Sequence, residues 1–223
     1  MSMMSKAVAP ACPFYPRIGK RIMDIALSGI GLVLVSPLLG VIGAMVRIRL
    51  GSPVLFRQVR PGIHGRPFML LKFRTMVDRR DEDGRPLPDA ERMNPLGRWM
   101  RRWSIDELAE LCNVLTGDMS LVGPRPLLTR YLERYTPEQA RRHEVKPGLT
   151  GWAQVNGRNA ITWEEKFKLD VWYVVNRSFA LDMKILAITA WKVLKREGIS
   201  AEGEVTMPEF MGTVSARGKT DNV

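Results

Sequence analysis

The sequence predicts an α+β fold, predominantly helical with short β-hairpins, in a monotopic membrane protein whose N-terminal part is a re-entrant helix-break-helix. Three observations support this prediction. Residues 25–46 carry no charged side chain, and a run of this length can cross a hydrocarbon core as a helix. Residues 54–76 form short apolar runs separated by turn residues. The second half of the chain holds helix-start signals and apolar residues at helical spacing.

The 223 residues are enough for one domain with a substantial core and additional segments. We expect four parts along the chain. These are an N-terminal tail at residues 1–16, the re-entrant membrane helix at 17–50, a cytosolic domain at 51–200 and a weakly ordered tail at 201–223.

Basic residues flank the apolar run on both sides, and such residues near membrane helices favour the cytoplasmic side. A helix that bends at Ser36-Pro37 keeps both ends in the cytoplasm, because Pro37 removes one helical hydrogen bond and Ser36 can satisfy a freed carbonyl. We therefore predict a wedge in one leaflet. A helix that spans the bilayer is the first alternative, since proline also occurs in true spans. A buried core helix of a soluble protein is the second.

The formal net charge of +11 indicates a polyanionic neighbour, such as nucleic acid, an anionic membrane surface or a phosphorylated substrate. No nucleic acid is expected as a partner, because the chain lacks an aromatic stacking motif and a groove-reading element. A non-catalytic scaffold that binds anionic lipid is a further alternative. The two cysteines, Cys12 and Cys112, lack the spacing of a zinc site or a disulfide framework.

Several local elements follow the apolar run. VLFRQV and FMLLKFRTM, joined by RPGIHGRP, predict a β-hairpin. The charged stretch at residues 78–95, broken by Gly and Pro, predicts a mobile surface loop. Asn156-Gly157 is a hairpin-turn signal, and Thr162 with Glu165 predicts a capping box. Helices are expected at residues 104–115, 126–135, 137–143, 162–176 and 181–197.

The last expected helix is amphipathic. Its apolar residues recur at helical spacing, with lysine and arginine elsewhere on the helix. Two interpretations are open: the helix packs on the core, or it lies on a membrane surface with Trp191 at the interface.

The stretch SIDELAELCNVLTGDMSLVGPRP contains the adjacent acidic pair Asp106 and Glu107. One interpretation is structural, because Ser104 and Glu107 have the spacing of a capping box. The other is chemical, because the chain also offers cations suited to phosphate. Arg125 lies between two prolines, which limit its backbone freedom and prepare it to grip a phosphate or carboxylate. The joint occurrence of these groups suggests a pyrophosphate site.

The chain resembles the bacterial sugar transferases, specifically the small monotopic phosphoglycosyl transferases. The resemblance covers about residues 17–203 and rests on several long motifs in order. They are KRIMDI, the Ser36-Pro37 break, KFRTM, SIDELAELCNVLTGDMSLVGPRP and KPGLTGWAQVNGRNAITW.

This resemblance implies the transfer of a sugar 1-phosphate from a UDP-sugar to undecaprenyl phosphate, with release of UMP, as the first membrane step of a bacterial glycan pathway. It implies that Asp106 attacks the sugar-bearing phosphate and forms a covalent intermediate. Glu107 would be its partner in handling Mg²⁺ or a proton, and both carboxylates are expected as Mg²⁺ ligands. Phosphate contacts are expected from Lys72, Arg101, Arg125 and Arg158.

The same resemblance implies a location on the cytoplasmic face of the bacterial inner membrane, and it leaves room for a homodimer. Cations are required at such a site. A carboxylate about 4 Å from a phosphate charge is repelled by about 4 kcal/mol at an effective dielectric constant near 20, or roughly a thousandfold in rate.

Overall fold

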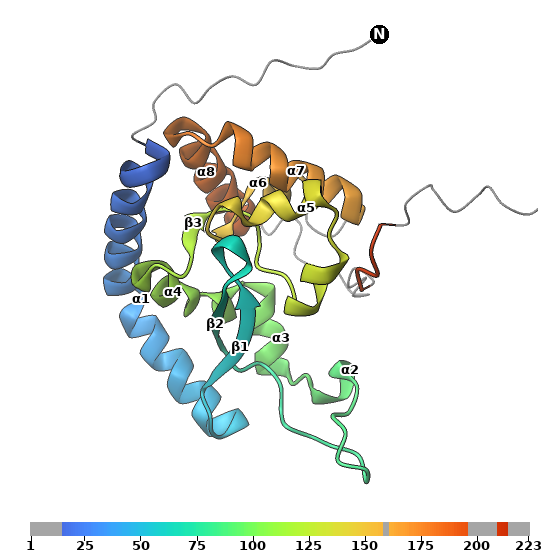
Figure 1. Cartoon of the computed structure of the whole chain (residues 1–223). Helices are drawn as coiled ribbons and strands as arrows, with labels where there is room; N and C mark the ends of the chain where they lie inside the picture. Colours follow the sequence, from blue (N-terminus) through green and yellow to red (C-terminus); the bar gives the residue numbers. More distant parts are fainter. Residues whose placement is uncertain (1–14, 158–160, 196–208, 214–223) are drawn as a thin grey trace, which may run out of the picture.

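The computed structural model describes residues 15–157, 161–195 and 209–213. In that part of the chain, helices surround two small pairs of strands (Figure 1). The α-helices are α1 Lys20–Leu50, α2 Asp89–Arg92, α3 Pro95–Arg102, α4 Glu110–Thr116, α5 Pro137–Ala140, α6 Trp152–Asn156, α7 Trp163–Asn176 and α8 Phe179–Lys195. A π-helix at Tyr15–Gly19 precedes α1, and short 3-10 helices are η2 Ile63–Gly65, η3 Ile105–Glu107, η4 Thr129–Arg134 and η5 Arg141–Glu144.

The apolar run forms helix α1 of 31 residues. Among the described residues it is the one helix long and apolar enough to cross a membrane, which confirms the long apolar N-terminal helix. The helix continues through Pro37, and Figure 1 shows its axis changing direction part of the way along. Ser36 Oγ donates to the Val33 carbonyl at 2.8 Å, the group that an N–H at position 37 would otherwise reach.

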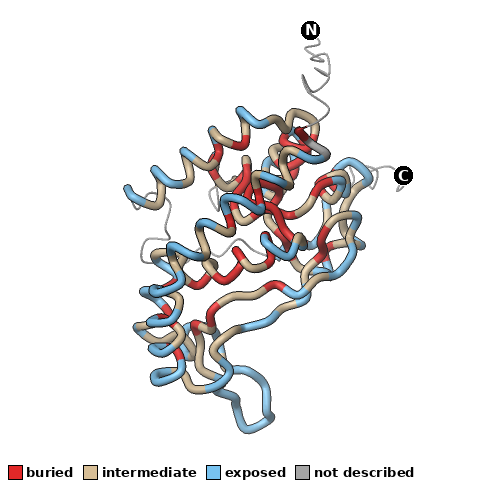
Figure 2. The backbone as a smooth tube through the Cα atoms, turned by 90° about the vertical axis from the view of Figure 1, so that its left-hand side faces the viewer, coloured by how far each residue is buried: buried red, intermediate tan, exposed pale blue. Residues whose placement is uncertain are grey.

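Both ends of α1 are fastened to the same domain. Near the N-terminal end, Lys20 Nζ lies 2.5 Å from Asp182 Oδ2, and Asp24 Oδ1 accepts from the Leu121 amide at 3.0 Å. Near the C-terminal end, Ile42 and Val46 are buried in one apolar cluster with Phe73 of strand β2 (Pro67–Phe73) and Met100 of helix α3. Figure 2 views the molecule from the α1 side and shows exposed stretches along this helix. The outer side carries exposed Ile22, Ile25, Ile30, Val33, Leu34, Leu38, Val41 and Ile48.

The predicted hairpin is confirmed. Strands β1 Leu55–Pro61 and β2 Pro67–Phe73 pair antiparallel, with Leu55 opposite Phe73. The second strand pair is not a hairpin: β3 Ser120–Val122 and β4 Gly148–Thr150 are parallel and come from segments far apart in the sequence. The hairpin turn at Asn156-Gly157 is wrong, because Asn156 ends helix α6 and its Nδ2 donates to the Trp152 carbonyl at 2.8 Å.

The helices after the β1–β2 hairpin agree only in part with those predicted from the sequence. Helix α7 begins at the predicted capping box, in which the Glu165 amide donates to Thr162 Oγ1 at 3.2 Å. The short helix expected at 137–143 is present as α5 followed by η5. The helix expected at 126–135 is only a 3-10 turn, η4, which starts after the two prolines around residue 125. The helix expected at 104–115 is divided into η3 and α4.

Helix α8 packs on the core, in agreement with the first of the two interpretations. Ile185 is fully buried, and Leu181 and Ile188 pack against the same cluster. Trp191 and Leu194, farther along the helix, are exposed. The predicted surface loop at residues 78–95 is largely exposed and projects from the body of the molecule (Figure 1), and it contains the short helix α2.

Most of the predicted C-terminal tail lies outside the described residues. Its residues 209–213 lie against the domain. Phe210 is 2% exposed and packs edge-on against Tyr131 and Phe167 at ring-centroid distances of 5.7 and 4.9 Å.

Candidate active site

Three segments converge on the acidic pair. Strand β2 is joined to helix α4 through Asn113, which accepts from the Leu71 amide at 3.0 Å and donates to the Met69 carbonyl at 2.8 Å. This join places Lys72, the next residue of β2, beside the acidic residues of η3 and α4. The third segment is the loop after β3, which carries Arg125.

Lys72 and Arg125 meet at Glu107. Lys72 Nζ lies 2.7 Å from Glu107 Oε1, and Arg125 forms ion-paired hydrogen bonds to both Glu107 oxygens, with Nη1 3.3 Å from Oε2. Burial opposes ionisation of Glu107, but Arg125 and Lys72 outweigh burial and hold the pKa of Glu107 below its usual range. The ionised form of Glu107 is therefore favoured between these two cations.

The capping box expected at Ser104 is wrong. Ser104 adopts a left-handed conformation with φ 53°, and its side chain makes no capping hydrogen bond. The Glu107 side chain turns to Lys72 and Arg125 instead. The physical reason is one of magnitude, because hydrogen bonds between charged groups contribute about 1.5–3 kcal/mol and a cap about 1 kcal/mol. A left-handed serine two residues before Asp106 is a strained position of the kind that clusters at functional sites.

Asp106 is buried, with 8% of its surface exposed. Within the described part of the chain, no side chain donates a hydrogen bond to its carboxylate. Burial raises the pKa of Asp106, and the negative charge of Glu107 adds to this, while Lys72 and Arg101 act in the opposite direction. Asp106 is therefore a buried carboxyl group with two cations nearby, Lys72 and Arg101.

Arg101 lies on α3 and is exposed, with Nε donating to Thr75 Oγ1 at 3.1 Å. Helix α3 can approach the segment that follows strand β2 closely because residue 97 is glycine, where an added Cβ would lie 1.9 Å from the Thr75 carbonyl oxygen. Arg101 is close enough to Asp106 to act on its pKa. The cations paired with Glu107 are Lys72 and Arg125, and Arg101 is not one of them. Arg158, the fourth expected phosphate contact, lies outside the described residues.

Close backbone packing fixes the segment that carries Arg125. The Gly123 amide donates to the Thr150 carbonyl at 2.8 Å, and the Gly148 amide donates to the Pro124 carbonyl at 3.0 Å. An added Cβ on Gly148 would lie 2.0 Å from the Gly123 nitrogen, so only glycine permits this approach. Gly148 and Gly151 thus pack against the segment that carries Arg125 and do not form part of a hairpin.

Sequence reasoning missed Glu110. Its side chain is 2% exposed, and its Oε1 lies 3.1 Å from Lys72 Nζ. Burial raises the pKa of Glu110 to about 7, with Lys72 opposing and the charge of Glu107 adding to the rise. The spacing of three residues from Glu107 was a usable signal, because such residues share one face of a helix.

Two further cations near Arg125 were also missed. Burial lowers the pKa of Arg60, and the positive charge of Arg125 adds to this. Burial likewise lowers the pKa of Lys166 to about 8, with Asp170 opposing. Both residues come from elements distant in sequence, and nothing in their local pattern marks them.

Of the two carboxylates expected to bind Mg²⁺, the structure leaves Asp106 as the one suited to the ion. Among the described residues, no three His, Cys, Asp or Glu side chains form a group that could hold a metal. Of the expected pair, Glu107 already faces two cations, whereas the Asp106 carboxylate has no hydrogen-bonding side chain among the described residues. Mg²⁺ is commonly held by one or two carboxylates together with substrate phosphates and water. Asp106 and the phosphates of a bound substrate satisfy that requirement.

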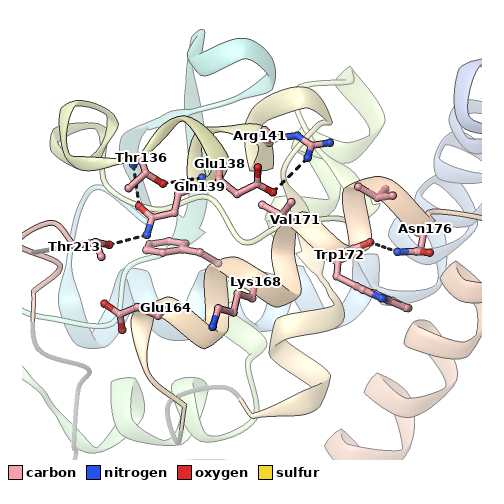
Figure 3. Close-up of a pocket in the computed structure, with 12 residues that line it drawn as sticks. Thr136, Glu138, Gln139, Arg141, Glu164, Lys168, Val171, Trp172, Asn176 and Thr213 are labelled. Atoms are coloured by element: carbon pink, nitrogen blue, oxygen red, sulfur yellow. Dashed lines mark hydrogen bonds and ion pairs between the residues drawn. The ribbon is translucent and has the colours of Figure 1, made fainter. Parts of the chain in front are cut away.

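A cavity of about 570 Å³ lies apart from this site, between α5 and α7 (Figure 3). Its lining is mainly apolar, and Gln139 Nε2 donates to Thr213 Oγ1 at its edge at 2.7 Å. None of the described residues expected to bind substrate lines it. Size alone therefore does not identify the reacting centre.

Comparison with known proteins gives consistent similarities. A sequence model described as bacterial sugar transferase matches residues 15–196. An uncharacterized sugar transferase, EpsL of Bacillus subtilis, is 58% identical over 194 residues, which cover 87% of this chain and 96% of that protein.

Two relatives are named for a specific transfer. The UDP-glucose:undecaprenyl-phosphate glucose-1-phosphate transferase of Escherichia coli is 38% identical over 202 residues, covering 82% of this chain and 43% of the relative. The undecaprenyl-phosphate galactose phosphotransferase of Salmonella typhimurium is 39% identical over 199 residues, covering 82% and 42%. The chain thus spans less than half the length of these two relatives.

Proposed function

The chain belongs to the bacterial sugar transferase family, and from this premise we propose that it transfers a sugar 1-phosphate from a UDP-sugar to undecaprenyl phosphate and releases UMP. One observation carries the proposal. The buried Asp106 carboxylate has cations nearby, and the residues around it, Ile105 and Ala109, pack in the apolar cluster that includes Ile42 and Val46 of helix α1. Such a site suits one water-soluble and one lipid substrate, in the first membrane step of a glycan pathway.

In the first proposed step, an Asp106 carboxylate oxygen attacks the phosphorus that bears the sugar. A P–O bond to Asp106 forms, the P–O bond to the UMP phosphate breaks, and UMP leaves with the bonding electrons. In the second step, a phosphate oxygen of undecaprenyl phosphate attacks the same phosphorus. The bond to Asp106 then breaks, which restores the carboxylate and gives undecaprenyl diphosphate sugar.

The cations of the site offset the charge of its own carboxyl groups, so a bound diphosphate needs additional positive charge. Three carboxyl groups, those of Asp106, Glu107 and Glu110, face three cations, Lys72, Arg101 and Arg125. A diphosphate therefore brings negative charge that the resting site does not balance. Arg60 and Lys166 add positive potential near Arg125. Phosphoryl transfer depends mainly on this kind of positioning and charge neutralisation.

We include Mg²⁺ in this proposal, with Asp106 as its protein ligand. When bound, the ion would neutralise charge on the donor diphosphate. Glu107 has a different part in the proposal. It holds Lys72 and Arg125 in a fixed arrangement beside Asp106.

We further propose that α1 enters one leaflet from the cytoplasmic side and returns to it. A straight helix of this length spans about 46 Å, and a bilayer-crossing arrangement would separate its two ends. Yet Lys20 and Asp24 at one end, and Ile42 and Val46 at the other, contact the same domain. Its middle also follows the domain, because an added Cβ on Gly31 would lie 3.7 Å from Leu111.

Thiol labelling tests this arrangement. With Cys112 changed to serine, native Cys12 reports the side before α1, and Ser52→Cys reports the side after it. A membrane-impermeant thiol reagent should label both positions in inside-out vesicles and neither in right-side-out vesicles. Labelling of the two positions from opposite sides would show a spanning helix.

Release of UMP tests the activity. Purified protein is mixed with a panel of UDP-sugars and Mg²⁺, with and without undecaprenyl phosphate. Continuous UMP release should require the lipid and one UDP-sugar, and Asp106→Asn should abolish it. If no UDP-sugar gives UMP with the lipid present, the proposed activity is wrong and a lipid-binding scaffold becomes the better explanation.

A further inference from the structure

We propose that a buried ion pair between Arg142 and Asp170 positions Arg125, and thereby sets how tightly the donor diphosphate is bound. The inference rests on the proposed function, because it assigns Arg125 a contact with that diphosphate. Arg142 and Asp170 are positioning residues in this account, since neither contacts Asp106, Glu107 or Lys72.

The geometry behind Arg125 is specific. Arg142 Nη2 donates to the main-chain carbonyl of Arg125 at 2.7 Å. Arg142 Nη2 and Nε also donate to Asp170 Oδ2, at 2.8 and 3.1 Å. The side chains of Arg142 and Asp170 are 1% and 2% exposed. Helix α7, through Asp170, therefore fixes the guanidinium that holds the arginine segment.

Aromatic rings enclose this guanidinium. Its central carbon lies 5.9 Å from the ring centroid of Tyr135 and 5.7 Å from that of Phe167. The planar fork of an arginine can bond a carboxylate and a carbonyl at once, while its faces lie against rings. A lysine has one nitrogen at its end and cannot reproduce this arrangement. The site is therefore built for arginine rather than for positive charge alone.

Stability is a weak explanation for such a pair. Removing two charges from water is costly, and well-packed apolar residues often replace a buried ion pair without loss. Arg142 does something that an apolar residue could not do, because it donates to a main-chain carbonyl next to the active site. A continuous series of contacts links Asp170, Arg142, Arg125 and Glu107. A shift of the Arg125 main chain would move its side chain relative to Glu107 and to a bound diphosphate.

A double-mutant cycle tests the inference. Arg142→Lys keeps the positive charge but loses the forked guanidinium. Asp170→Asn keeps an acceptor oxygen but loses the negative charge. If Arg142→Lys does not fold, Asp170→Asn provides the test. Each is made in the wild-type protein and in Arg125→Lys. The measurements are KM and kcat for UDP-sugar in UMP release, together with the fraction of folded protein.

We expect each positioning variant to raise KM about tenfold in the wild-type background, with a smaller change in kcat, because a phosphate contact acts on bound substrate and transition state alike. In the Arg125→Lys background, the same variant should change KM less than about twofold. A purely structural role predicts another result: less folded protein lowers the apparent kcat and leaves KM unchanged.

Two control variants match these changes. Arg141→Lys alters the neighbouring arginine, whose side chain is 40% exposed and pairs with Glu138 and Glu144. Val174→Ala removes buried volume from the same helix as Asp170. Neither should raise KM. Equal effects of Arg142→Lys on KM in both backgrounds, in an active wild-type protein, would overturn the inference, whereas an inactive wild-type protein would overturn the proposed function itself.

Discussion

Gly148→Ala tests whether the parallel strand pair holds the Arg125 segment in place. The added Cβ would lie 2.0 Å from the Gly123 nitrogen and 2.4 Å from the Thr150 oxygen, and real Cβ contacts are essentially never shorter than 3.0 Å. The strands must therefore move apart by about 1 Å, because close-packed backbone has no room to yield. That movement breaks the bonds from Gly123 to Thr150 and from Gly148 to Pro124. At about 1–3 kcal/mol for each buried bond, we expect a loss of about 2–6 kcal/mol.

Urea unfolding in detergent, followed by tryptophan fluorescence, measures this loss. Gly29→Ala is the matched control, because nothing lies within 4 Å of a Cβ added there and alanine favours a helix by about 1 kcal/mol. The control should be as stable as the wild type or more so. Folded Gly148→Ala should also bind the donor less well, because Arg125 moves with its segment. An unchanged unfolding midpoint for Gly148→Ala would refute the reasoning.

Two further substitutions have defined outcomes. Burial raises the pKa of Glu110 from 4.5 to about 7 on folding, so the protonated form favours the folded state, and the stability that this group contributes is lost as pH rises through that range. Between pH 4.5 and 7 the free energy of unfolding, measured with urea, should fall on the order of 3 kcal/mol more for the wild type than for Glu110→Gln. Parallel curves of unfolding free energy against pH for the two proteins would contradict this. Phe210→Ala should cost about 3–5 kcal/mol because Phe210 is buried, whereas Met211→Ala, at a position 74% exposed, should cost little; equal losses would show that the C-terminal segment does not pack as described.

Local signals in the sequence predicted the parts of the fold that local physics decides. The long apolar helix follows from composition alone, and the first hairpin follows from apolar runs around a Gly-containing turn. Helix α7 begins at a capping box whose partners are three residues apart. Each of these elements depends on neighbours in sequence.

Long-range contacts decided the parts that sequence reasoning got wrong. Ser104 and Glu107 match the capping pattern, but Lys72 and Arg125 bind Glu107 more strongly than a serine amide could. Asn156-Gly157 matches a hairpin turn, but the preceding glycines pack against the segment of Gly123.

The candidate site shows the same division. The motifs nominated the acidic pair and its cations as candidates, and the structure brings Lys72 and Arg125 to Glu107. Glu110 was missed although its spacing of three residues from Glu107 was a local signal, because its importance arises from burial beside Lys72, a residue of another segment. Arg142 was missed for a similar reason, since its partners Asp170 and Arg125 come from other segments.

The central claim is that the Asp106 carboxylate becomes covalently bonded to the phosphorus of a sugar phosphate. Intact-protein mass spectrometry after mixing with the active UDP-sugar, without undecaprenyl phosphate, tests it most directly. The account predicts a mass increase of one sugar phosphate, located by peptide mapping to Asp106, absent from Asp106→Asn and lost when the lipid is added. An active wild-type protein that shows no adduct under rapid quenching, or an adduct on another residue, would contradict it.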